Sequence, residues 1–291
     1  MACVNANGIT IEYDVRGRDD GEPLLLVMGL GAQLTDWPSD FVDLLVDGGF
    51  RVIRLDNRDA GLSTEFDWEP PSIPKVAALM ATRRKPEAGY VLRDMADDAA
   101  GLLDSLGVGS AHIAGASMGG MIAQTLAIHH ADRVRSLTSI MSTTGHRKAG
   151  RPERRLVAKV ARLPEPTREN AVDRAVAMFR LIAGSEFDES EFRTRAEEGV
   201  ERSFRPAGTG RQLAAILASP DRTEALGAVT APTLVLHGLA DPLVRPSGGV
   251  ATAKAIPDSR LVMYPEMGHD LPRRRWPEIV GAITRNAERA A

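Results

Sequence analysis

The sequence predicts an α/β fold in which a mostly parallel, doubly wound sheet is covered by helices and carries one inserted helical cap. Short apolar runs alternate with longer amphipathic ones along most of the chain, which is typical of parallel strands joined by helices. The alternation stops between residues 143 and 219, where only helical patterns occur. The length of 291 residues suits one such domain with an insertion better than two independent domains.

The first half of the chain supplies most of the expected sheet. Short apolar runs predict strands over residues 9–15, 24–28, 51–55, 111–114 and 134–141. A helix is expected over residues 94–106, before the fourth of these strands. Another is expected over residues 121–130, between the fourth strand and the fifth. These elements follow the order strand, helix, strand that a parallel sheet requires.

The second half begins with the insertion and then returns to the sheet. Four apolar residues of the insertion recur at the spacing of one helix face, and these are Val172, Val176, Phe179 and Ile182. Strands are expected again over residues 233–237 and 260–264, and a last helix begins near Pro277. We therefore predict a core of residues 1–142 and 220–291, with residues 143–219 as the helical cap.

Composition excludes several classes of function. The balance of 36 basic and 39 acidic residues, with 4% aromatics, offers no basic or stacking surface for nucleic acid. Cys3 is the single cysteine, so no internal disulfide or cysteine cluster for zinc is expected, and a reducing cytoplasm fits. No segment approaches the ~20 apolar residues of a membrane span, and the first residues lack the features of a targeting signal.

The most informative motif is Gly115-Ala116-Ser117-Met118-Gly119. It follows an apolar strand and precedes a helix, which is the setting of a nucleophile elbow. In that turn a serine lies at a tight bend, and the glycines two residues before and after it avoid steric clashes. The motif predicts Ser117 as the nucleophile.

A serine nucleophile needs a histidine to take its proton. In an open parallel sheet the site lies at the carboxyl ends of the strands, and His269 follows the last strand there after a short loop. It is the predicted general base. The other five histidines fit less well: His112 starts a strand, His129 and His130 end a helix, His237 is expected to be packed, and His146 opens the cap, where solvent or a ligand could contact it.

Asp241 is the predicted acid, since it also follows a strand at the carboxyl edge. Asp258 precedes its strand and faces the opposite edge. Asp270 is adjacent to His269, and a neighbouring side chain rarely folds back onto the same imidazole. The chain order serine, aspartate, histidine is the one expected for this arrangement.

Backbone amides are expected to stabilise the oxyanion that forms when serine attacks a carbonyl, at about 3 kcal/mol per donor. One is the amide of Met118, at the start of the helix after the elbow. The other is the amide of Leu30 in the run Met28-Gly29-Leu30-Gly31, where glycines let the backbone approach the substrate. The alternative is that these glycines only form a turn.

With these residues the chain resembles the α/β-hydrolase superfamily over its whole length. The resemblance also rests on the turn from Asp56 to Ser63, to which it assigns a structural role beside the oxyanion loop. Among the branches, the chain looks most like the serine esterases related to aclacinomycin methylesterase, through Trp37-Pro38 and Glu266-Met267-Gly268-His269. The commoner pattern has His-Gly where this chain has Met28-Gly29. A serine nucleophile differs from the aspartate of the dehalogenase and epoxide hydrolase branches.

A substrate pocket is expected to be apolar, since flexible thioethers and leucine accept acyl or alkoxy groups. The candidate residues are Gly29, Trp37, Met141, Phe179 and Met267. Phe179 could instead pack between cap and core. Seven basic residues of the cap, from Arg147 to Arg162, form either a solvated surface or one that attracts an anionic lipid or acyl carrier.

The sequence therefore predicts a hydrolase of carboxylic esters that needs no cofactor or metal. Ser117 would attack, His269 would transfer the proton and Asp241 would orient the imidazole. The expected partner is a small-molecule ester, and a homodimer is left open. An acyltransferase, a perhydrolase or a ligand-sensing protein that does not turn over are the alternative functions.

Overall fold

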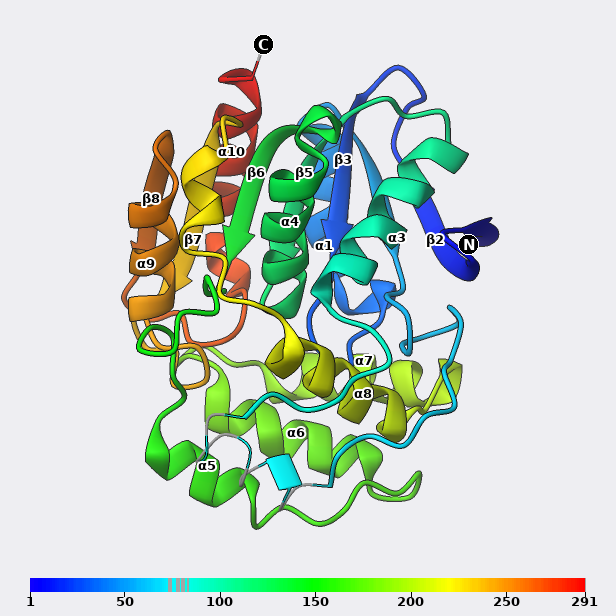
Figure 1. Ribbon diagram of the computed structural model, residues 1–291, viewed down its shortest axis with the longest axis vertical. Coiled ribbons are helices and arrows are strands. Elements are labelled where there is room, and N and C mark those ends of the chain that lie inside the picture. The colour runs from blue at the N-terminus through cyan, green and yellow to red at the C-terminus, as the bar shows by residue number, and fades with distance from the viewer. Residues whose placement is uncertain (73–74, 77–78, 80–81, 83, 291) are drawn as a thin grey trace.

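The computed structural model describes residues 1–72, 75–76, 79, 82 and 84–290, and its centre is an eight-stranded sheet (Figure 1). The strands lie in the order β1-β2-β4-β3-β5-β6-β7-β8. Their bounds are Ala2–Ala6, Ile9–Arg16, Glu22–Val27, Phe50–Leu55, Ala111–Ala116, Val134–Ile140, Thr233–Gly238 and Ser259–Tyr264 for β1 to β8. The pairs β1–β2 and β2–β4 are antiparallel and all other neighbours are parallel. The predicted fold class is confirmed.

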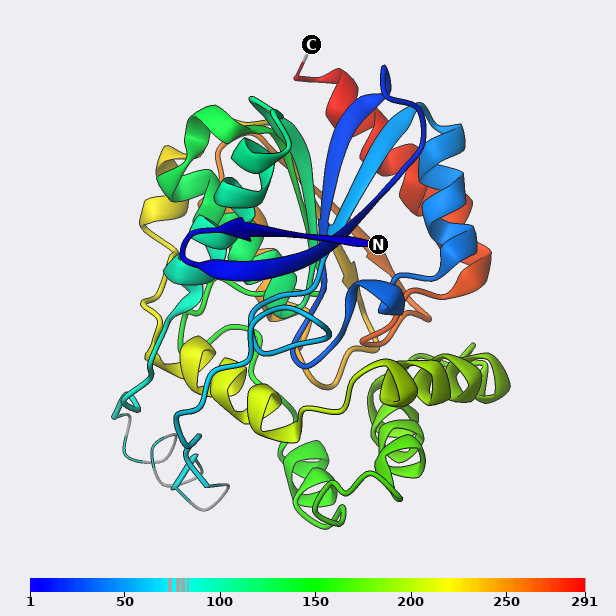
Figure 2. The ribbon, with the colours of Figure 1, turned by 90° about the vertical axis from the view of Figure 1, so that its right-hand side faces the viewer.

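Helices cover both faces of this sheet (Figure 2). One face carries α1 (Ser39–Asp47) and α10 (Trp276–Glu288). The other carries α3 (Leu92–Ser105), α4 (Met118–His129) and α9 (Ser247–Ala255). The alternation of strand side chains divides the apolar core accordingly. In β3, for example, Leu25 and Val27 join the α3–α4 side, while Leu24 and Leu26 join the α1–α10 side.

Four helices separate β6 from β7 and lie beyond the carboxyl ends of the parallel strands (Figure 1). They are α5 (Arg154–Val160), α6 (Ala171–Ile182), α7 (Glu189–Arg202) and α8 (Pro206–Ala218). Residues 143–219 are all described and contain no strand. We call them the cap segment. On α6, Val176 and Ile182 are buried, and Val172 and Phe179 are half-buried.

The elements expected from the sequence are all present, with ends shifted by a few residues. Among the described residues, the strand β1 and the α-helices α1 and α9 were not expected. β1 is short and mostly exposed, so it lacks an apolar run, and α9 contains two glycines that weaken a helical pattern. The largest shift is at α4, which begins at Met118, directly after Ser117, and not at Met121.

Candidate active site

Ser117 lies between β5 and α4 in a backbone conformation that L-residues rarely adopt, with φ 57° and ψ −117°. Its amide donates to the carbonyl oxygen of Ile140 at 2.9 Å, which continues the pairing of β5 with β6. Its own carbonyl oxygen accepts from the Ser142 hydroxyl at 2.8 Å. The serine is therefore fixed at the carboxyl edge of the sheet, and its side chain is only partly buried.

The two glycines of the motif are required by close backbone contacts. A Cβ at Gly115 would lie 2.1 Å from the carbonyl oxygen of Gly119, and a Cβ at Gly119 would lie 2.0 Å from that of Val27. Both distances are far below van der Waals contact, so any larger residue would push α4 away from β5 and β3. The sharp turn at Ser117 therefore depends on both glycines.

His269 is in hydrogen-bond contact with both Ser117 and Asp241. Its Nε2 lies 2.9 Å from the Ser117 Oγ, and its Nδ1 lies 2.7 Å from the Asp241 Oδ2. The loop that carries the histidine follows β8, and the His269 amide donates to the Ile182 carbonyl oxygen at 2.7 Å, at the end of α6. The structure thus brings together the three side chains that the sequence selected for the catalytic roles.

Asp241 is buried, with 2% of its surface exposed, and both oxygens of its carboxylate have hydrogen-bond partners. Besides His269, it accepts from the amides of Leu243 and Val244, each at 2.9 Å. These two bonds orient the carboxylate within the loop after β7. A carboxylate held in this way can stabilise positive charge on the imidazole.

A second imidazole, that of His237, lies close to this carboxylate. Its Nε2 is 2.7 Å from the carbonyl oxygen of Val244 and 3.6 Å from the Asp241 Oδ2. Because a carbonyl only accepts, this nitrogen carries the proton. Burial lowers the pKa of His237, so the ring is neutral at pH 7. His237 is therefore packed, as the sequence indicated, and it leaves His269 as the imidazole that contacts the serine.

The two amides expected to stabilise an oxyanion lie close to the serine. Met118 is the first residue of α4. Gly29 lies beside Ser117, since a Cβ on Gly29 would be 3.2 Å from the Ser117 Cβ and 3.7 Å from its Oγ. Among the described residues, neither the Leu30 nor the Met118 amide donates a hydrogen bond. Both donors are thus available to a ligand beside Ser117.

The aspartate-rich turn contacts the loop after β3, in agreement with the structural role expected for it. Asp56 accepts from the Leu34 amide at 2.7 Å, and Asn57 donates to the Met28 carbonyl oxygen at 2.9 Å. A contact that the sequence did not predict involves Gln212 of α8, which accepts from the Gly31 amide at 2.7 Å. A lone glutamine 181 residues away carries no signal of such a contact.

The residues proposed for a substrate pocket differ in their surroundings. Trp37 is 1% exposed and stacks on Phe41, within the core on the α1 side. Met141 and Met267 belong to the same buried cluster. Phe179 packs on other aromatic rings of the cap segment. Gly29 lies beside the serine, and an acyl-binding role of all five residues stays a prediction.

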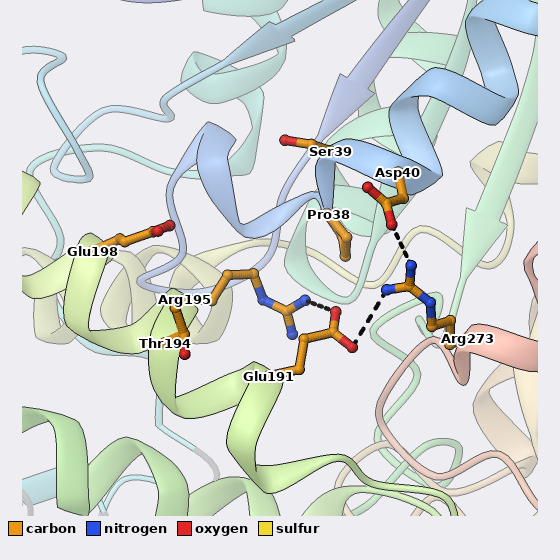
Figure 3. Close-up of a pocket in the computed structure, with 8 residues that line it drawn as sticks. All are labelled: Pro38, Ser39, Asp40, Glu191, Thr194, Arg195, Glu198 and Arg273. Atoms are coloured by element: carbon orange, nitrogen blue, oxygen red, sulfur yellow. Dashed lines mark hydrogen bonds and ion pairs between the residues drawn. The ribbon is translucent and has the colours of Figure 1, made fainter.

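A hollow beside the cap segment is separate from these residues. It measures about 330 Å³ and lies between α1 and α7 (Figure 3). Arg273 pairs there with Asp40 of α1 and with Glu191 of α7, the latter at 3.5 Å, and Arg195 pairs with Glu191 at 3.1 Å. Both guanidinium groups already have carboxylate partners. The hollow is therefore a charged contact between cap segment and core.

Two statements about other kinds of site apply to the described part of the chain. It contains no cluster of three or more His, Cys, Asp or Glu side chains arranged to bind a metal ion. It also contains no helix that is long and apolar enough to cross a membrane.

Comparison with known proteins agrees with the fold. The sequence profile of the alpha/beta hydrolase fold family matches residues 22–272. Rhodomycin D methylesterase of Streptomyces sp. (strain C5) is 28% identical over 96% of this chain and 95% of its own. The rhodomycin D methylesterase of Streptomyces peucetius is 29% identical over 94% of both chains.

Solved structures give the same picture. A thermophilic esterase from Thermogutta terrifontis superposes with a TM-score of 0.71 at 28% identity, covering 100% of this chain and 99% of that one. An enol-lactonase from Burkholderia xenovorans superposes with a TM-score of 0.73 at 21% identity, covering 99% of both chains. The second likeness is one of fold.

Proposed function

The chain belongs to the alpha/beta hydrolase fold family, and from that premise we propose that it is a serine esterase that works through Ser117, His269 and Asp241. The observation that carries the proposal is the continuous hydrogen-bond path from the Ser117 Oγ through the imidazole to the buried carboxylate, at 2.9 and 2.7 Å. The methylesterase relatives and the esterase structure support the hydrolysis of carboxylic esters. The family match and these relatives make the chain a carboxylic ester hydrolase; the roles of the three residues are the proposal.

In the proposed reaction the Ser117 oxygen bonds to the ester carbonyl carbon while its proton passes to the His269 Nε2. Asp241 accepts from Nδ1 and stabilises the imidazolium. The tetrahedral intermediate then breaks its bond to the alkoxy oxygen, which takes the proton from His269 and leaves as the alcohol. Water repeats the same steps on the acyl-enzyme, and the carboxylic acid is released.

The oxyanion of each tetrahedral intermediate would accept from the amides of Leu30 and Met118. The Met118 amide also lies at the N-terminus of α4, where aligned peptide dipoles favour negative charge. A single donor of this kind contributes about 3 kcal/mol to stabilising the transition state. Both donors are backbone groups, so side-chain substitution at these positions leaves them in place.

Methyl esters are the substrate class that we propose to test first. Two relatives that match nearly the whole chain are methylesterases. The proposed pocket residues are mostly apolar, which suits an uncharged ester group. A polar or charged acid part of the substrate would then have to lie toward the open side of the site.

The test compares steady-state hydrolysis of methyl, ethyl and butyl esters of one aromatic acid, with p-nitrophenyl acetate as a general probe. Sustained turnover is expected, with kcat/KM highest for the methyl ester. Added alcohol or hydrogen peroxide measures acyl transfer against hydrolysis and so distinguishes an acyltransferase or a perhydrolase. A single turnover followed by no further product would contradict esterase function and favour the ligand-sensing alternative.

A further inference from the structure

The loop that carries the Leu30 amide is held on both sides by side chains from distant segments. On one side, Asn57 donates to the carbonyl oxygen of Met28 at 2.9 Å. On the other, the Gly31 amide donates to the Gln212 Oε1 at 2.7 Å. The peptide between Gly29 and Leu30, which contains the Leu30 N–H, lies between these two anchored peptides. Its orientation is therefore set by its two neighbours.

The direction of the Leu30 N–H follows from the same loop. The carbonyl oxygen of Gly29 accepts from the Ala32 amide at 3.3 Å, which closes a turn. In a trans peptide the N–H points away from the C=O, so the Leu30 N–H points away from Ala32. The turn itself depends on Gly31, whose φ of +70° is in the left-handed region. The amide of the same glycine donates to Gln212.

Gln212 is 0% exposed, and both ends of its amide are bonded. While Oε1 accepts from Gly31, Nε2 donates to the carbonyl oxygen of Arg58 at 2.7 Å. These partners fix which end of the amide is oxygen, because one is a donor and the other an acceptor. Gln212 is the side chain that accepts from the Gly31 amide, so removing its amide group takes this acceptor away from the loop.

The helix that carries Gln212 is itself fixed against the core. A Cβ on Gly208 would lie 2.1 Å from the Asp59 carbonyl oxygen, so the first turn of α8 touches the backbone of the aspartate-rich turn. One turn later, the Arg211 Nε lies 2.9 Å from the buried carboxylate of Asp59. Thr209 lies against Gly31, since a Cβ added at Gly31 would lie 2.6 Å from the Thr209 Oγ1. Gln212 therefore links two rigid segments.

We propose that Gln212 of the cap segment is a positioning residue that sets the Leu30 amide for the oxyanion. This proposal rests on the proposed function. It implies that the cap segment contributes to stabilising the transition state and does not only cover the site. The hydrogen bonds of Gln212 go to Gly31 and Arg58 and not to Ser117. It acts through the Gly31 amide, so its loss affects the oxyanion more than the bound ester.

The test is Gln212→Met, which keeps the length of the side chain and removes both hydrogen bonds. We expect kcat to fall by about 10-fold to 100-fold, below the about 10²-fold to 10³-fold loss of a direct oxyanion donor. KM should change by less than about 3-fold, because the ground-state ester gains little from the oxyanion site. Affinity for an alkyl boronic acid, which forms a tetrahedral adduct on serine, should fall by the same factor as kcat.

Gln124→Met is the matched control. Gln124 is also 0% exposed, and its amide donates to the Ser139 Oγ and accepts from Arg222. Neither of these partners belongs to the loop of Leu30, so this variant should lose stability and keep the kcat and the boronic acid affinity of the wild type. If Gln212→Met does not fold, Gln212→Asn, which is too short to span both partners, is expected to show the same losses.

A folded Gln212 variant with wild-type kcat and wild-type boronic acid affinity would overturn the proposal. An equal loss in Gln124→Met would also overturn it, because the effect would then be general destabilisation. Wild-type protein that hydrolyses no ester contradicts the proposed function instead. In that case the boronic acid comparison between wild type and variant still decides the role of Gln212.

Discussion

At the scale of single residues, two neighbouring carboxylates show how partners decide a role. The Asp241 carboxylate contacts the His269 Nδ1 at 2.7 Å. The Asp270 carboxylate accepts from the amides of Gly184 and Gly268, at 3.0 and 2.9 Å. Asp270 therefore joins the loop of His269 to the end of α6, and the hydrogen bonds of the imidazole go to Asp241 and Ser117 instead. The role of each carboxylate therefore depends on the direction of its side chain and not on its distance from the histidine along the sequence.

The first prediction concerns the nucleophile. Ser117→Ala should lower kcat by about 10⁶-fold, because loss of a triad nucleophile costs about as much as loss of the whole triad. The fold should be unchanged, since the backbone hydrogen bonds of Ser117 do not involve its side chain. A fluorophosphonate probe should label the wild type and leave the variant unlabelled. Labelling of the alanine variant would assign the nucleophile to another residue.

The second prediction separates the two carboxylates. Asp241→Asn should reduce kcat by about 10⁴-fold, which is typical of this change in a serine triad, because the amide favours the wrong imidazole tautomer. Asp270→Asn should cost less than about 10-fold, since its remaining oxygen can still accept from Gly184 and Gly268. Steady-state kinetics of both variants on one ester shows which carboxylate orients the imidazole. A larger loss in Asp270→Asn would contradict the assignment of the acid.

At the scale of elements, alternation and strand ends were enough to select the three residues of the candidate site. Ser117, Asp241 and His269 each follow a strand whose apolar run is visible in the sequence, and a parallel sheet brings such strand ends to one edge. The helix α9 could not be found this way, because its two glycines mask a helical pattern. It was also impossible to place α8 on the core, since that contact depends on Gly208 and Gln212 fitting partners far away in sequence.

The third prediction concerns α6. The Phe179 ring lies 4.0 Å, between centroids, from that of Phe192 and 6.2 Å from that of Phe187, which favours packing within the cap segment over contact with an acyl group. Phe179→Ala should therefore lower stability, by less than the about 3 to 5 kcal/mol of a fully buried phenylalanine. Its preference among p-nitrophenyl esters of increasing acyl length should stay that of the wild type.

Phe187→Ala is the control for this prediction, since Phe187 belongs to the same aromatic group. If Phe179 does line an acyl site, its variant alone should change the chain-length preference, by about 10-fold to 200-fold at most. Thermal unfolding and the ester series on both variants distinguish the two roles. An altered preference confined to Phe179→Ala would support the acyl-site role that the sequence suggested.

At the scale of the whole molecule, the cap segment and the core both hold the loops of the candidate site. The His269 amide donates to Ile182 at the end of α6, and the Gly31 amide donates to Gln212 of α8. Charged side chains join α7 to α1 at the hollow in Figure 3. The sequence could indicate that an insertion exists between two strands. It could not indicate these attachments, because each one joins a cap residue to a core residue through tertiary packing and leaves no periodic pattern.

The last prediction concerns the loss of stability at acid pH. It depends on His112, which lies near the start of β5, between β3 and β6 in the sheet. Its ring is 3% exposed, with Nδ1 2.8 Å from the Ser136 Oγ. Burial lowers the pKa of His112 to about 4, with a smaller contribution from Arg135. In the unfolded chain the ordinary pKa is 6.5. Between these values the unfolded state binds a proton that the folded state does not, so stability falls as the pH falls from 6.5 to about 4.

Replacing the ring by an amide should remove this part of the acid sensitivity. His112→Asn keeps a polar atom for Ser136 and cannot titrate, so its free energy of unfolding, although lower at pH 7, should decline less between pH 6.5 and 4 than that of the wild type. Urea unfolding at four pH values measures the slope. His146→Asn in the cap segment is the control and should keep the wild-type slope. An unchanged slope in His112→Asn would mean that the acid sensitivity arises at other groups, of which the buried imidazole of His237 is the next to test.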